Sequence, residues 1–136
     1  MFGLFLSIML QTSSVPSAPV LDRAEGRWAL DPAETEQRGR FTCEDDPLVI
    51  SIDKQAMRYR AVTSSSSDDA DILTVGESFF VLRYDGEERL DENGQPLIWL
   101  FYLIDDDHFA WLRDDQVKKQ NFGRTALRMR CPTDGS

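Results

Sequence analysis

Apolar and polar side chains alternate along several short stretches of this chain, as they do in half-buried β-strands. Within 48–53, Leu48, Ile50 and Ile52 share one face. Within 57–62, apolar residues alternate with Arg58 and Arg60 in the same way. Together with less regular stretches, this pattern predicts eight strands, at 26–30, 48–53, 57–62, 72–75, 78–84, 97–104, 108–113 and 122–131.

Turn-forming and polar segments separate the predicted strands. The segment 63–71 contains four consecutive serines and is expected to be a loop, and 114–120 is expected to be a polar connection. One short helix is predicted after the first strand. Asp31 would be its N-cap, Pro32 its first residue and Gly39 its end. No long amphipathic helix alternates with the strands, which argues against a parallel α/β fold.

These elements predict an all-β protein. Strands joined in sequence by turns pair as antiparallel neighbours, and closing the sheet removes its exposed edges. We therefore expect an antiparallel, eight-stranded up-and-down barrel with one short helix after the first strand. On the last strand, alternation sets Leu127 and Met129 opposite Arg128 and Arg130.

The segment 97–104 departs from alternation, because all eight of its residues are apolar. Such a run is typical of a strand that is buried on both faces. One face can line the barrel interior. We expect the other face to be covered by the N-terminal segment, by the small helix and loops, or by a second molecule.

The first eighteen residues carry no charged side chain, whereas the rest of the chain carries all 24 acids and all 15 lysines and arginines. An apolar run followed by small residues is typical of a secretory signal peptide. We expect 1–18 to be a signal peptide and 19–136 to be a single periplasmic or secreted domain. The alternative is an N-terminal helix or strand kept in the fold. The run is shorter than the about 20 apolar residues of a membrane span.

Charge and cysteine content narrow the possible partners. A net charge of −9 disfavours binding to nucleic acid and to anionic membranes, and it favours a basic protein partner or simple solubility. The two cysteines, Cys43 and Cys131, are too few for a structural zinc site. In an oxidising compartment we expect them to form a disulfide, and the alternative is two buried thiols.

The constellation Gly26-x-Trp28 at the start of the first predicted strand, with Cys43 downstream, resembles the lipocalins and the wider calycin group, including small exported bacterial proteins with lipocalin-like barrels. The resemblance extends from the first strand to the last. It implies that Trp28 plugs one end of the barrel and that Arg128 or Arg130 packs over it. The alternative is that Trp28 is an ordinary core aromatic.

No motif specifies a reaction. His108 is the single histidine, and the sequence has no Gly-x-Ser-x-Gly elbow around a nucleophile. The acidic clusters match no calcium loop, and we expect them to be solvated turns. We therefore expect no catalytic residue, no metal site and no cofactor. The acidic clusters are 44–46, 68–71, 105–107 and 114–115.

These observations favour a non-catalytic protein that binds a small, partly apolar ligand in the barrel, an expectation that rests on analogy of fold. A barrel of this size can instead be filled by its own side chains. A second hypothesis is an acidic protein-binding module, such as an inhibitor of a basic secreted enzyme like lysozyme. A hydrolase or isomerase is the third, and the protein is expected to be a monomer or a homodimer. The inward-facing residues expected to line a ligand site are Ile50, Met57, Tyr59, Phe80, Trp99, Phe101, Trp111 and Leu127.

Overall fold

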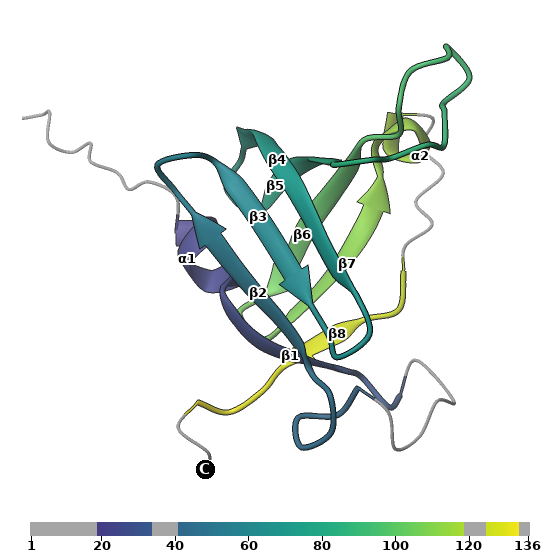
Figure 1. Cartoon of the computed structure of the whole chain (residues 1–136). Coiled ribbons are helices and arrows are strands. Elements are labelled where there is room, and N and C mark those ends of the chain that lie inside the picture. Colours follow the sequence, from purple (N-terminus) through teal and green to yellow (C-terminus); the bar gives the residue numbers. More distant parts are fainter. Residues whose placement is uncertain (1–18, 34–40, 119–124, 134–136) are drawn as a thin grey trace, which may run out of the picture.

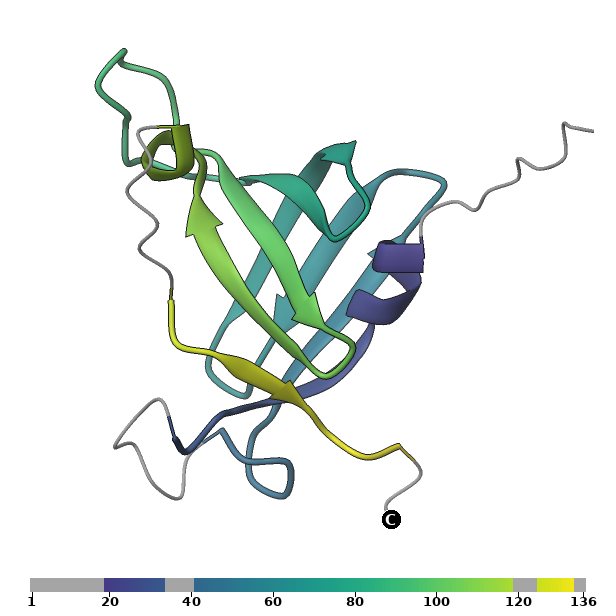
Figure 2. The same cartoon turned by 180° about the vertical axis from the view of Figure 1, so that it is seen from behind.

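The computed structural model describes residues 19–33, 41–118 and 125–133. Its strands form a closed antiparallel barrel in which each strand pairs with its neighbours in sequence and β1 pairs with β8 (Figures 1 and 2). The sequence prediction of an eight-stranded up-and-down barrel is confirmed. The strands are β1 Gly26–Leu30, β2 Leu48–Asp53, β3 Arg58–Val62, β4 Ser67–Val75, β5 Phe79–Tyr84, β6 Trp99–Asp105, β7 His108–Arg113 and β8 Arg128–Arg130.

The two ends of the barrel differ. The β2–β3, β4–β5 and β6–β7 turns gather at one end, which we call the closed end, because helix α1 (Pro19–Ala24) lies against it (Figures 1 and 2). Ion pairs join Asp22 to Lys54 and Arg23 to Asp106, and so tie α1 to two of these turns. The β3–β4 and β5–β6 connections lie at the opposite end, which we call the mouth.

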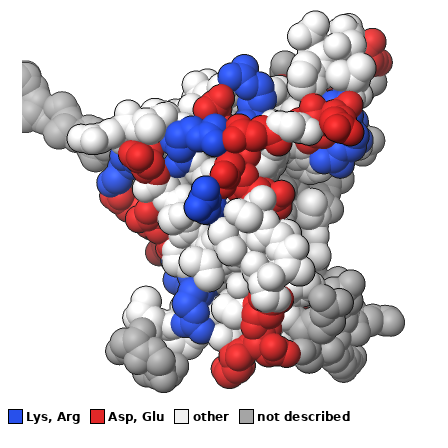
Figure 3. Space-filling model, viewed as in Figure 1, with Lys and Arg blue, Asp and Glu red and all other residues white. Residues whose placement is uncertain are grey.

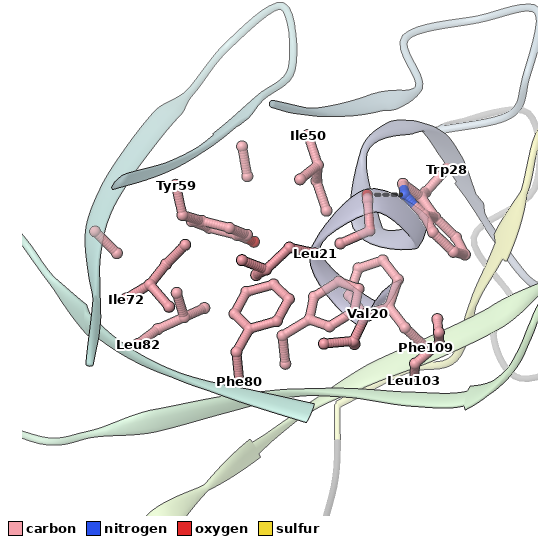
Figure 4. Close-up of a cluster of buried hydrophobic side chains, with 14 of the residues drawn as sticks. Val20, Leu21, Trp28, Ile50, Tyr59, Ile72, Phe80, Leu82, Leu103 and Phe109 are labelled. Atoms are coloured by element: carbon pink, nitrogen blue, oxygen red, sulfur yellow. Dashed lines mark hydrogen bonds between the residues drawn. The ribbon is translucent and has the colours of Figure 1, made fainter. Parts of the chain in front are cut away.

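Helix α1 supplies part of the core. Val20, Leu21 and Ala24 are buried, and Val20 and Leu21 point into the cluster of apolar side chains inside the barrel (Figure 4). Pro19 begins the helix, where its fixed φ is favourable and its missing N–H costs no hydrogen bond. The described short helix therefore precedes β1, whereas the sequence predicted one after β1. Most of that predicted helix, 34–39, lies outside the described residues.

Aromatic rings fill the barrel between the closed end and its middle (Figure 4). Phe101 stacks on Phe80 and on Phe109, with ring centroids 4.7 and 4.2 Å apart. Trp28 meets Phe109 edge-on at 4.8 Å. All four side chains are fully buried. Offset and edge-to-face ring pairs add to the stabilisation that burial alone provides, so this half of the barrel is a solid core.

Three local predictions were wrong for identifiable reasons. β4 begins at Ser67, so only 63–66 form the predicted loop; Asp69, expected in a turn, pairs with Arg60 on β3. Met57, predicted in a strand, lies in the β2–β3 turn with a φ of 53°. The polar connection after β7 begins with a helix, α2 (Asp114–Lys118). The polar composition of β4 and α2 had suggested irregular structure. Salt bridges between neighbouring strands stabilise β4, and acidic residues in the first turn are favourable in α2, so polar residues are compatible with both elements.

The predicted apolar run 97–104 forms most of β6, and its inward residues Phe101 and Leu103 are buried. On the outer face, Tyr102 and Ile104 remain 40% and 43% exposed. Leu100 lies between Val81 and Leu112 in the sheet and is half-buried. The expectation that this outer face is covered is therefore met only partly by the described residues.

Alternating acids and arginines cross the outer face of the sheet over β3 and β4 (Figure 3). Arg58 contacts Asp71 at 2.9 Å and Asp85 at 2.6 Å, and Asp71 also pairs with Arg83. The pKa of Asp71 is lowered, first by the hydrogen bond from Arg58 and then by the hydrogen bond from Arg83. These side chains neutralise one another, so this face contributes little to the net charge.

This network predicts a pH dependence of stability. A carboxyl group whose pKa is lower in the folded protein stabilises it above the unfolded-state pKa, and this stabilisation is lost as the pH falls through the folded-state pKa. We expect the free energy of unfolding of Asp71→Asn to fall less steeply than that of the unmodified protein as the pH decreases below about 4, where free aspartates titrate. Urea unfolding between pH 7 and pH 2 measures this slope. Asp45→Asn, outside the network, is the control, and equal slopes in the two variants would contradict the prediction.

Candidate functional site: the barrel mouth

A cavity of about 360 Å³ occupies the mouth of the barrel. Its walls are formed by inward-facing residues at the mouth ends of five strands, and its rim by Asp68 of β4, by the β5–β6 connection and by Thr125. The wall residues are Leu48, Ala61, Tyr84, Trp99 and Trp111, and the polar rim residues are Asp68, Asp85, Gly86, Glu87, Arg89 and Thr125.

Strand alternation places the wall residues. Leu48 begins β2 and shares its inward face with Ile50, while Ala61 follows Tyr59 by two positions on β3. Tyr84 ends β5 on the face of Leu82. Because successive inward positions descend from the mouth to the closed end, the outermost ones surround the cavity and the next ones form the core beneath it.

The floor of the cavity is a hydrogen-bonded aromatic group. The indole Nε1 of Trp111 donates to the hydroxyl of Tyr59 at 3.3 Å, and the rings of Tyr59 and Tyr84 meet edge-on with centroids 6.0 Å apart. Burial raises the pKa of Tyr59 to about 12 and raises the pKa of Tyr84 well above its ordinary value. Both phenols therefore stay protonated at neutral pH and act as hydrogen-bond donors.

The rim is fixed by Glu87, whose side chain is only 5% exposed. The guanidinium of Arg89 donates two hydrogen bonds to it and the backbone N–H of Arg89 a third, and the indole Nε1 of Trp99 lies 3.3 Å from the same carboxylate. The hydrogen bond from Arg89 is the main cause of the lowered pKa of Glu87. The guanidinium of Arg89 also lies 5.4 Å from the centre of the Trp99 ring. These contacts hold the Trp99 ring at the cavity wall.

Arg128 lies beside this site. Its guanidinium is flanked by two rings, Trp111 at 5.4 Å and Phe41 at 5.8 Å. Its Nη1 atom is buried and has no hydrogen-bond partner among the described residues. Burial lowers the pKa of Arg128, yet an arginine stays charged at physiological pH. Among the described residues Arg128 has no carboxylate partner, and it lies against Trp111 at the wall of the cavity.

Two of the residues predicted from the sequence to bind a ligand, Trp99 and Trp111, line this cavity. Met57 packs against the core in the turn at the closed end. Leu127 precedes β8 and is not among the lining residues. The remaining four belong to the core beneath the cavity: Ile50, Tyr59, Phe80 and Phe101.

The sequence analysis missed Leu48, Ala61 and Tyr84, which are also inward-facing positions. Alternation had identified the inward face of β2 and β3, but not which end of each strand lies at the cavity. The cavity lies at the mouth because α1 covers the closed end. The rim residues of the β5–β6 connection had no sequence signal beyond the turn motifs Asp85-Gly86 and Glu92-Asn93-Gly94, which indicate only that the chain reverses there.

At the closed end, the indole of Trp28 donates a hydrogen bond from Nε1 to the carbonyl of Ala24 at 3.0 Å. Arg130, the pairing partner of Trp28 on β8, places its guanidinium 4.3 Å from the centre of the Trp28 ring. Gly26 has a φ of 129°, which is unfavourable for other residues. Arg130 thus takes the place that the resemblance gives to a basic residue. Arg128 and Arg130 lie on the Trp28 side of β8, away from Leu127.

His108 lies among carboxylates in the part of the chain that the structure describes. The ring Nδ1 of His108 lies 2.9 Å from Asp105, and its Nε2 lies 3.9 Å from Asp31, all on the outside of the barrel. Across 19–33, 41–118 and 125–133, no group of three or more His, Cys, Asp or Glu side chains is arranged to hold a metal ion. None of the helices described there is long and apolar enough to cross a membrane.

Comparison of the chain with protein families, with curated proteins and with solved structures finds no match. The geometry of an eight-stranded, closed, antiparallel barrel is consistent with a lipocalin-like fold. The functional argument therefore rests on the site itself.

Proposed function

We propose that this protein binds a small, partly apolar ligand in the barrel mouth without catalysing a reaction. The observation that carries the proposal is the cavity of about 360 Å³ in the mouth, opposite α1 and above a buried aromatic core. Its volume lies within the roughly 300–1,000 Å³ of small-molecule sites. Aromatic walls with a few fixed polar groups are also typical of such sites.

The chemistry of the walls supports a ligand with both apolar and polar parts. Trp99 and Trp111 line the cavity, whereas Glu87 and Arg89 are engaged with each other at the rim. The buried floor supplies hydroxyl and indole hydrogen-bonding groups but no nucleophile activated by a base. These features suit recognition of a ligand and give no role to a reaction.

We expect the neutral apolar dye N-phenyl-1-naphthylamine to bind saturably at one site per chain, because the cavity can enclose aromatic rings. Trp99→Ala should weaken its binding by roughly tenfold, the effect of losing about 1.4 kcal/mol of ring contact. Tyr102→Ala, on the outer face of the same strand, is the matched control and should leave the affinity unchanged. A titration that follows dye fluorescence measures both.

Binding of the dye without saturation, or an equal loss of affinity in both variants, would refute the carrier proposal. The second candidate, a surface for a basic protein partner, would then be favoured by the outer face of β6. There, the exposed Tyr102 and Ile104 lie next to the Asp105–Asp107 turn.

We also propose that the protein acts in the periplasm or outside the cell. The Cys43–Cys131 disulfide supports this, since such bonds persist in oxidising compartments. The predicted signal peptide, 1–18, lies outside the described residues and remains a prediction.

A further inference from the structure

The ligand can be specified further from a buried hydrogen-bond donor that the protein leaves unused beside the cavity. Buried polar groups in folded proteins nearly always have a partner, so a buried donor without one calls for an explanation. Nη1 of Arg128 is such a donor, and it is the one buried side-chain nitrogen or oxygen without a partner in the described ranges. The guanidinium lies over the rings of Trp111 and Phe41.

Tyr59, on the floor of the cavity, lies in the same neighbourhood as Arg128. Its hydroxyl accepts a hydrogen bond from Nε1 of Trp111 at 3.3 Å, and Trp111 is one of the rings over which the Arg128 guanidinium lies. Burial is the main cause that raises the pKa of Tyr59, and the charge of Arg128 is among the causes that lower it, so the two side chains are close. A phenol hydroxyl that accepts one hydrogen bond still carries a hydrogen that it can donate.

An acceptor that carries negative charge satisfies both groups. Each N–H of a guanidinium donates, none accepts, and oxyanions are its strongest partners. We infer that the barrel mouth binds an amphiphile whose carboxylate, sulfonate or phosphate oxygens are held by Arg128, with the hydroxyl of Tyr59 as a second donor. This inference rests on the proposed function, since it places the polar group of the same ligand.

Two of the three acids that line the cavity are paired with arginines: Asp85 with Arg58, and Glu87 with Arg89. Burial raises the pKa of both Tyr59 and Tyr84, and the charge of the third acid, Asp68 of β4, raises it further, so an anionic group must lie on the Arg128 side of the cavity. Asp68 is exposed, and water and salt screen its charge. The charge of Arg128 acts from a largely buried position, where screening is weaker. The apolar part of the ligand then lies between Trp99 and Trp111, and its acidic group reaches Arg128 past the Trp111 ring.

Two dyes of nearly the same shape test the inference. The anionic dye 1-anilinonaphthalene-8-sulfonate carries a sulfonate that N-phenyl-1-naphthylamine lacks. We expect Arg128→Gln to weaken the anionic dye by roughly tenfold or more, as expected for a lost charged hydrogen bond. The neutral dye should keep its affinity within about twofold, a change worth less than a single hydrogen bond. Arg60→Gln, which makes the same charge change on the outer face of β3, is the control and should spare both dyes.

The outcomes separate this inference from the proposed function. If neither dye binds the unmodified protein at one site, the proposed function fails. If both bind and Arg128→Gln changes them equally or not at all, only the anionic group is refuted. Should Arg128→Gln fail to fold, as judged by circular dichroism, the unmodified protein still decides the matter. Decanoate should displace the neutral dye at roughly tenfold lower concentration than decanol, and equal displacement would overturn the inference.

Discussion

Trp28→Ala is expected to lower the free energy of unfolding by about 3–5 kcal/mol, the range for deleting a large buried aromatic side chain. Trp28 is fully buried and packs edge-on against Phe101 and Phe109. Its removal leaves a void next to α1 and deprives Arg130 of the ring that it covers. Both effects act at the closed end, so the solid half of the barrel loses its packing.

Two other variants separate the causes. Trp28→Phe keeps much of the ring packing but removes the hydrogen bond to Ala24, and it should cost about 1–2 kcal/mol. Trp99→Ala removes a half-buried ring at the mouth and should cost less than Trp28→Ala, because no sealed void results. Urea unfolding followed by circular dichroism measures all three. If Trp28→Ala cost no more than Trp99→Ala, Trp28 would not anchor the closed end.

The barrel itself could be predicted from the sequence because alternation is a local property. Tyr59 and Ala61 are buried as the pattern of β3 requires, while Arg60 on the same strand lies outside. Each strand meets its neighbour through a connection within the chain, so pairing follows from order alone. Closure then follows from the need to protect the two edges.

The position of the cavity could not be predicted, because it depends on which end is closed. Val20, Leu21 and Ala24 carry a helical spacing of apolar residues, but they were treated only as the start of the barrel domain. Once α1 closes one end, Trp99 and Trp111 lie at the open one. The inward residues nearer to α1, such as Phe80, become core.

The role of Arg128 could not be predicted either, because the sequence analysis set it opposite the inward-facing residues. An arginine is expected outside a barrel, since burying its charge is costly. In the structure the pairing of Leu30 with Arg128 and of Trp28 with Arg130 sets both arginines on the Trp28 side. Aromatic faces accommodate the two guanidinium groups there, which no alternation rule anticipates.

The disulfide between Cys43 and Cys131 is confirmed, with a Cα–Cα distance of 5.5 Å, and it closes a loop between residues 88 positions apart. Cross-linking a chain over such a separation restricts the unfolded state by about 4–5 kcal/mol in the chain-entropy model. The bond also holds the end of β8, a strand of only three residues. Beside it, the backbone N–H of Cys131 donates to the carbonyl of Arg27.

Removing this bond by the double substitution Cys43→Ser and Cys131→Ser should therefore lower the free energy of unfolding by about 4 kcal/mol. Because β8 carries Arg128, we also expect the double variant to lose affinity for the anionic dye before it unfolds, while the neutral dye remains bound. Urea unfolding tests the loss of stability in the double variant and in the unmodified protein with and without reductant. Dye titration in the absence of urea tests the loss of affinity. The reduced protein should behave like the double variant. Unchanged stability in both would show that the β1–β8 pairing alone secures the end of the chain, and the bond would then not maintain the position of Arg128.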